Sequence, residues 1–330
     1  MREKTDICDF PGDPLLSKLP FPHRAVFYPM GFPLEVETNS PEVLNALSKS
    51  WQMFPQQFSE EPLRMSVGVS HGDWSKLSPP PPPLLRSRSH LMSIVSDASN
   101  FLSCDLSRGF IFGWITEQLV GEESFFRYHF LDVSVLTAIQ QLHLAPVHAG
   151  LVARNGQGVA LCGNSSAGKS TMAYACARAG WTFVADDATF LLRKRADRYA
   201  IGNPYTIRFR EGARRLFPEL SHYACGTRPN GKFGIEAFTR HLPIATSPGC
   251  SIEHVVFLNR NGSSVAQLRP CRQVRAIDWC SRFAEWGDDG ARSHQAEAYR
   301  RLAGCGVWEM EYRDLESGVA RLEQLTQTGG

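Results

Sequence analysis

The feature that most constrains the fold of this chain is a glycine-rich stretch at residues 163–170. Its sequence, G-N-S-S-A-G-K-S, matches the pattern G-x-x-x-x-G-K-[ST] at every fixed position. The apolar residues 159–162 before it are typical of a buried strand, and residues 171–178 after it predict a helix that Gly180 closes. A strand, a glycine turn and a helix in this order predict a phosphate-binding loop, since the free amides and dipole of a helix start attract anions.

The residues of this loop have distinct expected roles toward a nucleotide. Lys169 is expected to reach the terminal phosphates, and the Ser170 hydroxyl is expected to bind magnesium. The predicted cofactors are therefore ATP and Mg²⁺. The alternative is a glycine-rich turn that matches the pattern by chance. The residues predicted to bind the nucleotide are Gly163, Asn164, Ser165, Ser166, Ala167, Gly168, Lys169, Ser170 and Thr171.

Composition excludes several classes of protein. The net charge of +2 is too small to indicate binding to nucleic acid or to an anionic membrane. No apolar run is long enough to cross a bilayer, and the N-terminus lacks the pattern of a signal peptide. The nine cysteines form no CxxC pairs, which favours reduced, mostly buried thiols. We therefore expect a cytoplasmic protein.

The pattern along the chain predicts an α/β fold in which a small α/β domain precedes a phosphate-loop domain. Residues 1–24 are rich in proline and predict an irregular lead-in, and residues 25–77 predict a small α/β module. Within this module, Ser40 followed by a proline predicts a helix start. Residues 78–87 contain five consecutive prolines and predict a stiff linker or loop. Residues 88–330 then form the phosphate-loop domain, with short strands at 91–95, 101–104 and 109–113 and a long amphipathic helix at 125–144.

Two adjacent carboxylates, Asp186 and Asp187, follow the predicted strand at 180–185. The carboxyl ends of strands are where ligands collect in α/β sheets. Phosphoryl transfer from ATP needs a magnesium ligand and a carboxylate that accepts a proton, so these residues are candidates for both roles. Adjacent side chains point to opposite sides of a strand, and both can serve one site only if the strand ends there and the chain bends. The alternative is that Asp187 forms a helix N-cap or a turn.

At these positions the sequence resembles the catalytic domain of HPr kinase/phosphorylase, whose nucleotide-binding architecture is similar to that of phosphoenolpyruvate carboxykinase. The resemblance lies in His148, the loop at 163–170 and the sequence V-A-D-D at 184–187, and it covers about residues 145–260. It is closer to HPr-kinase-like proteins of uncertain substrate, including lasso-peptide serine kinases. It implies that Lys169 and Ser170 bind phosphates and magnesium and that the Asp pair divides the roles of metal ligand, given to Asp187, and base. It also implies that His148 lies near the transferred phosphate.

The chain departs from that family at two places. Thr171 stands where the family has a Glu after the loop Ser, and the downstream signature E-x-x-x-x-R-G-L-G-I-I is not found. Because that signature belongs to the region of the phosphorylase reaction, this reaction is not expected here. A second cation besides Lys169 is needed to neutralise the transition state. Lys232 is the first candidate, followed by Arg228 and Arg208.

These observations predict a Mg²⁺-dependent kinase that transfers the terminal phosphate of ATP to a hydroxyl, with a Ser of a protein or peptide as the expected acceptor. Two alternatives stay open. One is an ATP-binding regulatory or sensor module without transfer activity, and the other is a small-molecule kinase of the free-serine type. A Ser-carrying protein or peptide is the expected partner, a homo-oligomer is compatible with the sequence, and neither nucleic acid nor membrane is expected.

Overall fold

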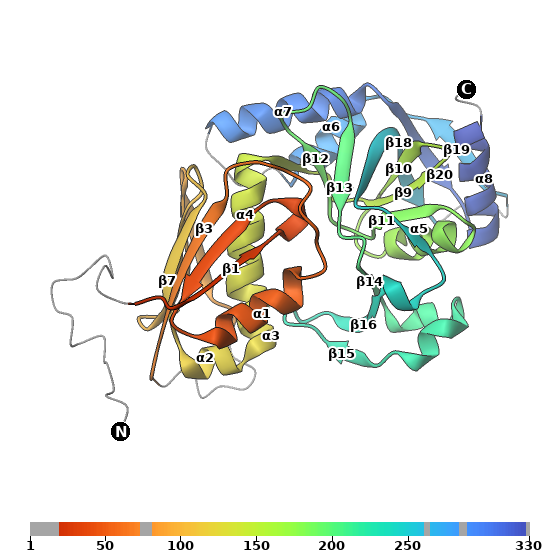
Figure 1. Cartoon of the computed structure of the whole chain (residues 1–330). Coiled ribbons are helices and arrows are strands. Elements are labelled where there is room, and N and C mark those ends of the chain that lie inside the picture. The colour runs from red at the N-terminus through yellow and green to blue at the C-terminus, as the bar shows by residue number, and fades with distance from the viewer. Residues whose placement is uncertain (1–19, 73–80, 261–264, 284–288, 328–330) are drawn as a thin grey trace. The chain divides into compact units, whose positions relative to one another are not determined.

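The computed structural model describes residues 20–72, 81–260, 265–283 and 289–327, and it divides the chain into two compact units (Figure 1). The first unit is Met1–Leu142 and the second is His143–Gly330. Both units combine helices with sheets, so the fold is of the mixed α/β class, as predicted. In the described part of the chain, no helix is both long enough and apolar enough to span a membrane. The eight cysteines in that part are free thiols.

The first unit is built on a seven-stranded sheet in the order β1-β2-β3-β7-β6-β5-β4. Strands β2, β3 and β7 are parallel neighbours, and the other neighbours are antiparallel. The strands are β1 (His23–Phe27), β2 (Leu34–Thr38), β3 (Leu63–Ser70), β4 (Leu84–Arg88), β5 (Leu91–Asp97), β6 (Asn100–Asp105) and β7 (Phe110–Thr116). The helical elements are η2 (Pro29–Gly31), α1 (Pro41–Trp51), α2 (Glu117–Gly121), α3 (Glu123–Phe126), η3 (Arg127–Asp132) and α4 (Val133–Leu142).

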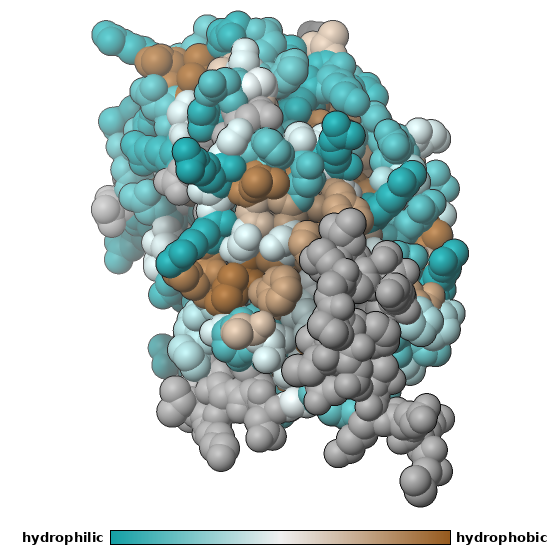
Figure 2. Space-filling model, turned by 90° about the vertical axis from the view of Figure 1, so that its left-hand side faces the viewer, coloured by the Kyte–Doolittle hydropathy of each residue, from teal (hydrophilic) through white to brown (hydrophobic). Residues whose placement is uncertain are grey.

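Only one face of this sheet is buried. Side chains alternate between buried and accessible along β2 and β3, the pattern expected when helices cover one side of a sheet. Helix α1 contacts β1 and β2, and α4 contacts β6 and β7. The opposite face carries a groove of about 720 Å³ whose lining includes Arg24, Val26, Glu35, Arg64 and Phe110. Figure 2 faces this side of the molecule and shows apolar patches among hydrophilic side chains.

The domain boundary of the structure differs from the one that the sequence predicts. The predicted linker at 78–87 lies partly outside the described residues, but Leu84–Arg88 forms strand β4. Strands β4 to β7 pair into the same sheet as β1 to β3, through the parallel contact of β3 with β7. The first unit therefore extends beyond residue 88 to Leu142, because pairing between strands far apart in sequence leaves no local signal at a boundary. The lead-in predicted for 1–24 lies outside the described residues up to 19, and β1 begins within it at His23.

The amphipathic helix predicted at 125–144 is present but is assigned to the first unit. It consists of α3, a π-helical turn at η3 and α4, and it ends at Leu142. Buried residues along it include Phe126, Phe130 and Ile139, which confirms the predicted apolar face.

The second unit contains a ten-stranded sheet. Its main path is β17-β11-β9-β10-β18-β13-β12-β8, with β20 beside β18 and β19 beside β20. A separate three-stranded sheet has the order β14-β16-β15. The strands are β8 (Leu144–Pro146), β9 (Gly150–Arg154), β10 (Gln157–Cys162), β11 (Thr182–Ala185), β12 (Thr189–Leu192), β13 (Tyr199–Gly202), β14 (Thr206–Phe209), β15 (Cys225–Thr227), β16 (Phe233–Phe238), β17 (Ala245–Thr246), β18 (Gly249–Asn259), β19 (Gln267–Pro270) and β20 (Gly306–Glu311). The helices are α5 (Lys169–Arg178), α6 (Val274–Ser281), α7 (Asp289–Ala303) and α8 (Leu315–Gln327), with short 3₁₀ turns at Glu211–Arg215, Pro218–His222 and Thr239–His241.

Two apolar cores pack against this sheet, one on each face. Val159 and Leu161 of β10 join the core that includes Met172 of α5 and Leu322 of α8. Ala160 and Cys162, which alternate with them along β10, join the core of α6 and α7 with Trp279 and Tyr299. Because β10 is buried on both faces and paired on both sides, the residues that follow its carboxyl end are held on a rigid support.

Candidate functional site

The predicted phosphate-binding loop connects the end of β10 at Cys162 to the start of α5 at Lys169. Gly168 has φ 97° and Gly163 has φ 154°, backbone conformations that favour glycine. A Cβ at Gly168 would lie 2.9 Å from Tyr312 Oη, and one at Gly163 would lie 2.7 Å from Ala167 Cβ. No side chain caps α5, and its first turn carries no acidic residue. The helix start therefore presents its amides and the positive end of its dipole to whatever lies in the loop.

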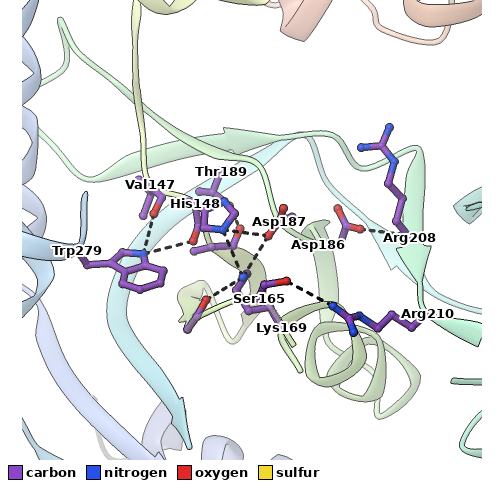
Figure 3. Close-up of polar contacts among 12 residues, drawn as sticks. Val147, His148, Ser165, Lys169, Asp186, Asp187, Thr189, Arg208, Arg210 and Trp279 are labelled. Atoms are coloured by element: carbon purple, nitrogen blue, oxygen red, sulfur yellow. Dashed lines mark hydrogen bonds and ion pairs between the residues drawn. The ribbon is translucent and has the colours of Figure 1, made fainter. Parts of the chain in front are cut away.

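Lys169 is held over this loop by three neighbours (Figure 3). Its Nζ donates to Gly163 O at 2.8 Å and lies 3.3 Å from Asp187 Oδ1 and 3.5 Å from His148 Nε2. The side chain is only 7% exposed, so this cation is largely removed from water and depends on these partners. Lys169 and Asp187, both candidates from the sequence, are therefore in direct contact.

The two aspartates have different environments. Strand β11 ends at Ala185 and the chain bends at Asp186 and Asp187, the condition that the sequence sets for both to serve one site. Asp187 faces Lys169 and is half exposed, whereas Asp186 is buried and its Oδ2 accepts a hydrogen bond from the Arg208 backbone N–H at 2.8 Å. Strand β12 follows rather than a helix, so Asp187 is not a helix N-cap, whereas the other half of the alternative, a turn, agrees with the bend at this position.

Burial raises the pKa of Asp186 from its ordinary value of 3.8 to about 6, although the positive charge of Arg208 opposes the rise. Desolvation acts in this direction because it disfavours the charged form of a carboxyl group. A carboxyl group with a pKa near neutrality is well suited to accept a proton during catalysis.

His148 borders both Lys169 and Asp187. It has φ 50°, its ring centroid is 4.5 Å from that of Phe283, and it stacks on Trp279 with centroids 6.2 Å apart. Trp279 Nε1 donates to Val147 O at 3.1 Å, which fixes the indole against this turn (Figure 3). Burial lowers the pKa of His148, the charge of Asp187 opposes this, and the charges of Lys169 and Lys232 lower it further. A neutral imidazole is therefore expected at neutral pH, with Nε2 3.7 Å from Asp187 Oδ1.

The candidate second cations are placed at different positions. Lys232 lies in the turn between β15 and β16 and acts on His148 through its charge. Arg208 directs its guanidinium to Glu236 at 2.8 Å and meets the site through its backbone N–H. The backbone N–H of Arg228 donates to Lys232 O within the same turn, so Arg228 is connected to the candidate site through Lys232. Lys232 therefore has the clearest electrostatic connection to the cluster.

Some residues at the loop were not assigned from the sequence. Arg210 Nη2 lies 3.5 Å from Ser165 Oγ, opposite the His148 side of the loop in Figure 3. Arg260 Cδ lies 3.5 Å from the position of a Cβ on Gly168. A pocket of about 510 Å³ opens at Gly163 and Asn164 and has Trp279 in its wall. The only sequence signal for Arg210 is the run of arginines from 208 to 215, and Trp279 follows the loop by more than a hundred residues.

The residues present are compatible with Mg²⁺ held in the company of a nucleotide. Among the described residues, no group of three or more His, Cys, Asp and Glu side chains is arranged to hold a metal by itself. Magnesium in nucleotide sites is held by one or two protein ligands together with phosphates and water, so such a cluster is not needed. Ser170, in the first turn of α5, and Asp187, beside Lys169, supply the oxygen atoms that this ion prefers.

Comparisons with known proteins give a family match and a structural match. Residues 122–208 match the family described as SynChlorMet cassette protein ScmC, which is less than half of the chain. Among solved structures, the Hpr(Ser) kinase/phosphatase from Coxiella burnetii matches with 12% sequence identity over 56% of this chain and 93% of that chain, at a TM-score of 0.24. A search of curated proteins finds no match. The matched family segment includes the phosphate loop, Lys169 and both aspartates, whereas the structural likeness is too low to carry an argument about function.

Proposed function

We propose that this protein is an ATP-dependent, Mg²⁺-dependent kinase that transfers the terminal phosphate to a hydroxyl group. The observation that carries the proposal is the contact of Lys169 Nζ with Asp187 Oδ1 at 3.3 Å and with Gly163 O at 2.8 Å, at the open start of α5. A buried lysine, free helix amides and a carboxylate are the groups that phosphoryl transfer requires. In a protein that only used this loop as a turn, no cation would need to be buried there.

Each residue of the cluster has a role in this proposal. The loop from Gly163 to Ser170 and Thr171 holds the phosphates of ATP, and Lys169 neutralises the charge of the terminal one. Ser170 and Asp187 hold the magnesium ion, which supplies further charge neutralisation when bound. His148 borders the transferred group as a neutral hydrogen-bonding partner, and Lys232 adds a positive charge from the β15–β16 turn.

Asp186 is the proposed base. Its Oδ2 accepts a hydrogen bond from the Arg208 backbone N–H, and the proposal assigns the other carboxyl oxygen to the acceptor hydroxyl. The acceptor oxygen forms a bond to the terminal phosphorus, the bond from that phosphorus to the bridging oxygen of ADP breaks, and the hydroxyl proton passes to Asp186. The pKa of about 6 makes this carboxylate a stronger base than an ordinary aspartate.

The burial of Asp186 favours a second candidate function, a nucleotide-binding sensor without transfer. At 8% exposure, this carboxyl group has little contact with solvent in the described conformation. A sensor would bind Mg²⁺–ATP through the same loop and transfer no phosphate to any acceptor.

Incubation with γ-labelled ATP, Mg²⁺ and Ser-containing peptides, followed by peptide analysis, tests the two candidates. The kinase proposal expects label on Ser that depends on Lys169 and Asp187, with calorimetric heat on addition of Mg²⁺–ATP. Heat without label across all acceptors would select the sensor. Label that is unchanged in both Lys169→Met and Asp187→Asn would exclude this site as the origin of transfer.

A further inference from the structure

A pocket of about 510 Å³ lies next to the phosphate loop in the second unit. It is bounded by the first two loop residues, the carboxyl-terminal part of β18 and helix α6 with the residues before it. Its lining includes Asn164, Phe257, Arg272, Arg275, Trp279 and Arg282. The volume is within the range of small-molecule sites, and the mixture of aromatic and charged groups is typical of a binding site.

The pocket opens at the end of the loop where the terminal phosphate is expected. Lysine in such loops reaches the terminal phosphates, and here its Nζ is fixed by the carbonyl oxygen of Gly163. Gly163 is also part of the pocket lining. In addition, Trp279 forms part of the pocket wall and stacks on His148, which neighbours both Lys169 and Asp187. The pocket therefore lies next to the residues that contact Lys169.

The charge of the lining is strongly positive. It contains three arginines and one acidic residue, Asp278. Arg275 is neutralised by Glu309 at 2.7 Å and stacks over Phe257, with 4.3 Å from its guanidinium carbon to the ring centroid. Arg282 lies 5.6 Å over the ring of Trp279, and neither it nor Arg272 forms an ion pair within the described chain. Two guanidinium groups thus remain available for a ligand.

We propose that this pocket is the acceptor site and that the acceptor carries a carboxylate close to its reacting hydroxyl. The inference rests on the proposed kinase function. Arginine binds a carboxylate through two parallel hydrogen bonds, and the indole and phenyl rings of the wall cover the apolar part of the acceptor. The carboxylate belongs either to an acidic residue beside the Ser of a peptide or to free serine.

Direct binding tests the pocket without requiring transfer. Three fluorescein-labelled peptides with one Ser, flanked by Glu, by Gln or by Lys, are titrated with the full-length protein and followed by fluorescence anisotropy. The Glu peptide is expected to bind at least about tenfold more tightly than the Lys peptide, since one charge-assisted hydrogen bond corresponds to about this factor. Competition by L-serine at equal potency to the Glu peptide would assign the carboxylate to the free amino acid, and the absence of competition would assign it to the peptide.

A charge reversal makes the test specific. In the double variant Arg272→Glu/Arg282→Glu, affinity for the Glu peptide is expected to fall about 100-fold, and the preference is expected to change to the Lys peptide. Both residues are exposed, so folding is expected to tolerate the change. Arg292→Glu/Arg300→Glu, two exposed arginines of α7, is the matched control with the same change in net charge and is expected to keep the wild-type preference.

The outcomes separate this inference from the kinase proposal. Equal binding of the three peptides, or an unchanged preference in the double variant, overturns the acidic-acceptor inference. In transfer assays, labelling of all three peptides at equal rates overturns the acidic-acceptor inference but supports the kinase proposal. Arginine-dependent binding of the Glu peptide without any Lys169-dependent transfer would support the pocket and contradict the kinase.

Discussion

Helices α1 and α5 each follow a strand, and their first turns carry charges of opposite sign. In the first unit, β2 ends at Thr38 and α1 begins at Pro41 after a connection of two residues. In the second unit, β10 ends at Cys162 and α5 begins at Lys169 after the six residues 163–168. Each connection follows a strand that has a parallel neighbour in its sheet, β3 beside β2 and β18 beside β10, so the local architecture is comparable. The difference lies in which charge is placed at the helix start.

Helix α1 carries an acid at its start, although no side chain caps its backbone amides. Ser40 occupies the N-cap position, Pro41 follows, and Glu42 lies in the first turn and accepts a hydrogen bond from Ser40 Oγ at 2.5 Å. This hydrogen bond lowers the pKa of Glu42. Helix α5 likewise has no capping side chain, but its first turn carries no acidic residue, and Lys169 adds a second positive charge there. An acid in the first turn neutralises the positive end of the helix dipole, and we call such a helix start closed. A helix start that carries a cation instead is open and attracts an external anion.

Replacement of Lys169 is expected to have the largest effect. Lys169→Met keeps the apolar stem and removes the ammonium group that lies 3.3 Å from Asp187. Phosphate transfer is expected to fall about 100- to 1,000-fold, the usual loss when one preorganised positive donor is removed. The measurement is single-turnover transfer of label from ATP. Lys49→Met, in the last turn of α1 and paired with Glu123, is the control and is expected to change the rate less than about twofold. An equal loss of transfer rate in both variants would contradict a special role of the lysine at the start of α5.

Asp186→Asn is expected to separate activity from stability. Transfer falls about 100-fold or more because the base is lost, while the folded protein becomes more stable at neutral pH. The folded protein keeps a proton on Asp186 up to about pH 6, whereas the unfolded chain releases it near 3.8. Between these values the folded state binds more protons, so stability falls as pH rises. At pH 7 this cost is on the order of 2–3 kcal/mol, and the variant lacks it.

Urea denaturation at pH 4.5, 6 and 7.5 measures this effect. The stability gain of Asp186→Asn over wild type is expected to grow with pH across this range and to level off above pH 7. Asp197→Asn, in a surface turn, serves as the control because the pKa of Asp197 is lowered by its hydrogen bond with Arg195, which predicts the opposite sign. A gain for Asp186→Asn that does not vary with pH would contradict the raised pKa. The contrast between Asp186, whose pKa is raised, and Glu42 of α1, whose pKa is lowered, would then be lost.

Gly168→Ala tests whether the backbone of the phosphate loop is as constrained as its geometry indicates. The φ of 97° disfavours alanine, and the added Cβ would lie 2.9 Å from Tyr312 Oη. The free energy of unfolding is expected to fall by about 2–3 kcal/mol, about 1 from the backbone and the rest from displacement of Tyr312. Gly156→Ala is the matched control, since Gly156 has φ 77° and open space around it, and about 1 kcal/mol is expected. Chemical denaturation measures the free energy of unfolding of both variants. An equal decrease in the two would mean that Tyr312 moves aside without an energetic cost.

The parts of the fold that the sequence predicts well are those determined by neighbouring residues. The hairpin at Asn155 and Gly156 has the two positive φ values that this dipeptide favours, and Gly180 ends α5 with φ 87°. The boundary at residue 88 was wrong because the pairing of β3 with β7 joins segments about forty residues apart. Nothing in the composition between them distinguishes strands of one sheet from strands of another.

The same reasoning applies to the candidate site. Lys169, Asp186 and Asp187 lie within one strand–helix–strand unit, so their proximity follows from local order. The different environments of the two aspartates depend on Arg208, which comes from another sheet. Trp279 reaches Val147 across 132 positions of sequence, and no local pattern encodes that contact. Chemistry carried by a motif is therefore predictable, and the walls of the pocket around it are not.

The smallest effect is expected at the closed helix start. Glu42→Gln removes the negative charge from the first turn of α1 and is expected to lower the free energy of unfolding by about 0.3–0.5 kcal/mol, because water screens an exposed charge. Since its pKa is lowered from 4.5, the contribution of Glu42 is present above this value and is lost as pH falls through the lower pKa of the folded state. Denaturation at pH 7 and pH 3 measures this difference, with the exposed Glu61→Gln as the control.

A loss of several kcal/mol in Glu42→Gln would contradict this account of α1, and so would a loss that persists at pH 3. If the expected small value holds, closing a helix start with an acid contributes little to the stability of this protein. Leaving α5 without such an acid then costs a similarly small amount of stability. That amount is well below the transition-state stabilisation expected from Lys169 at the same place, so an open helix start is a low-cost way to build an anion site.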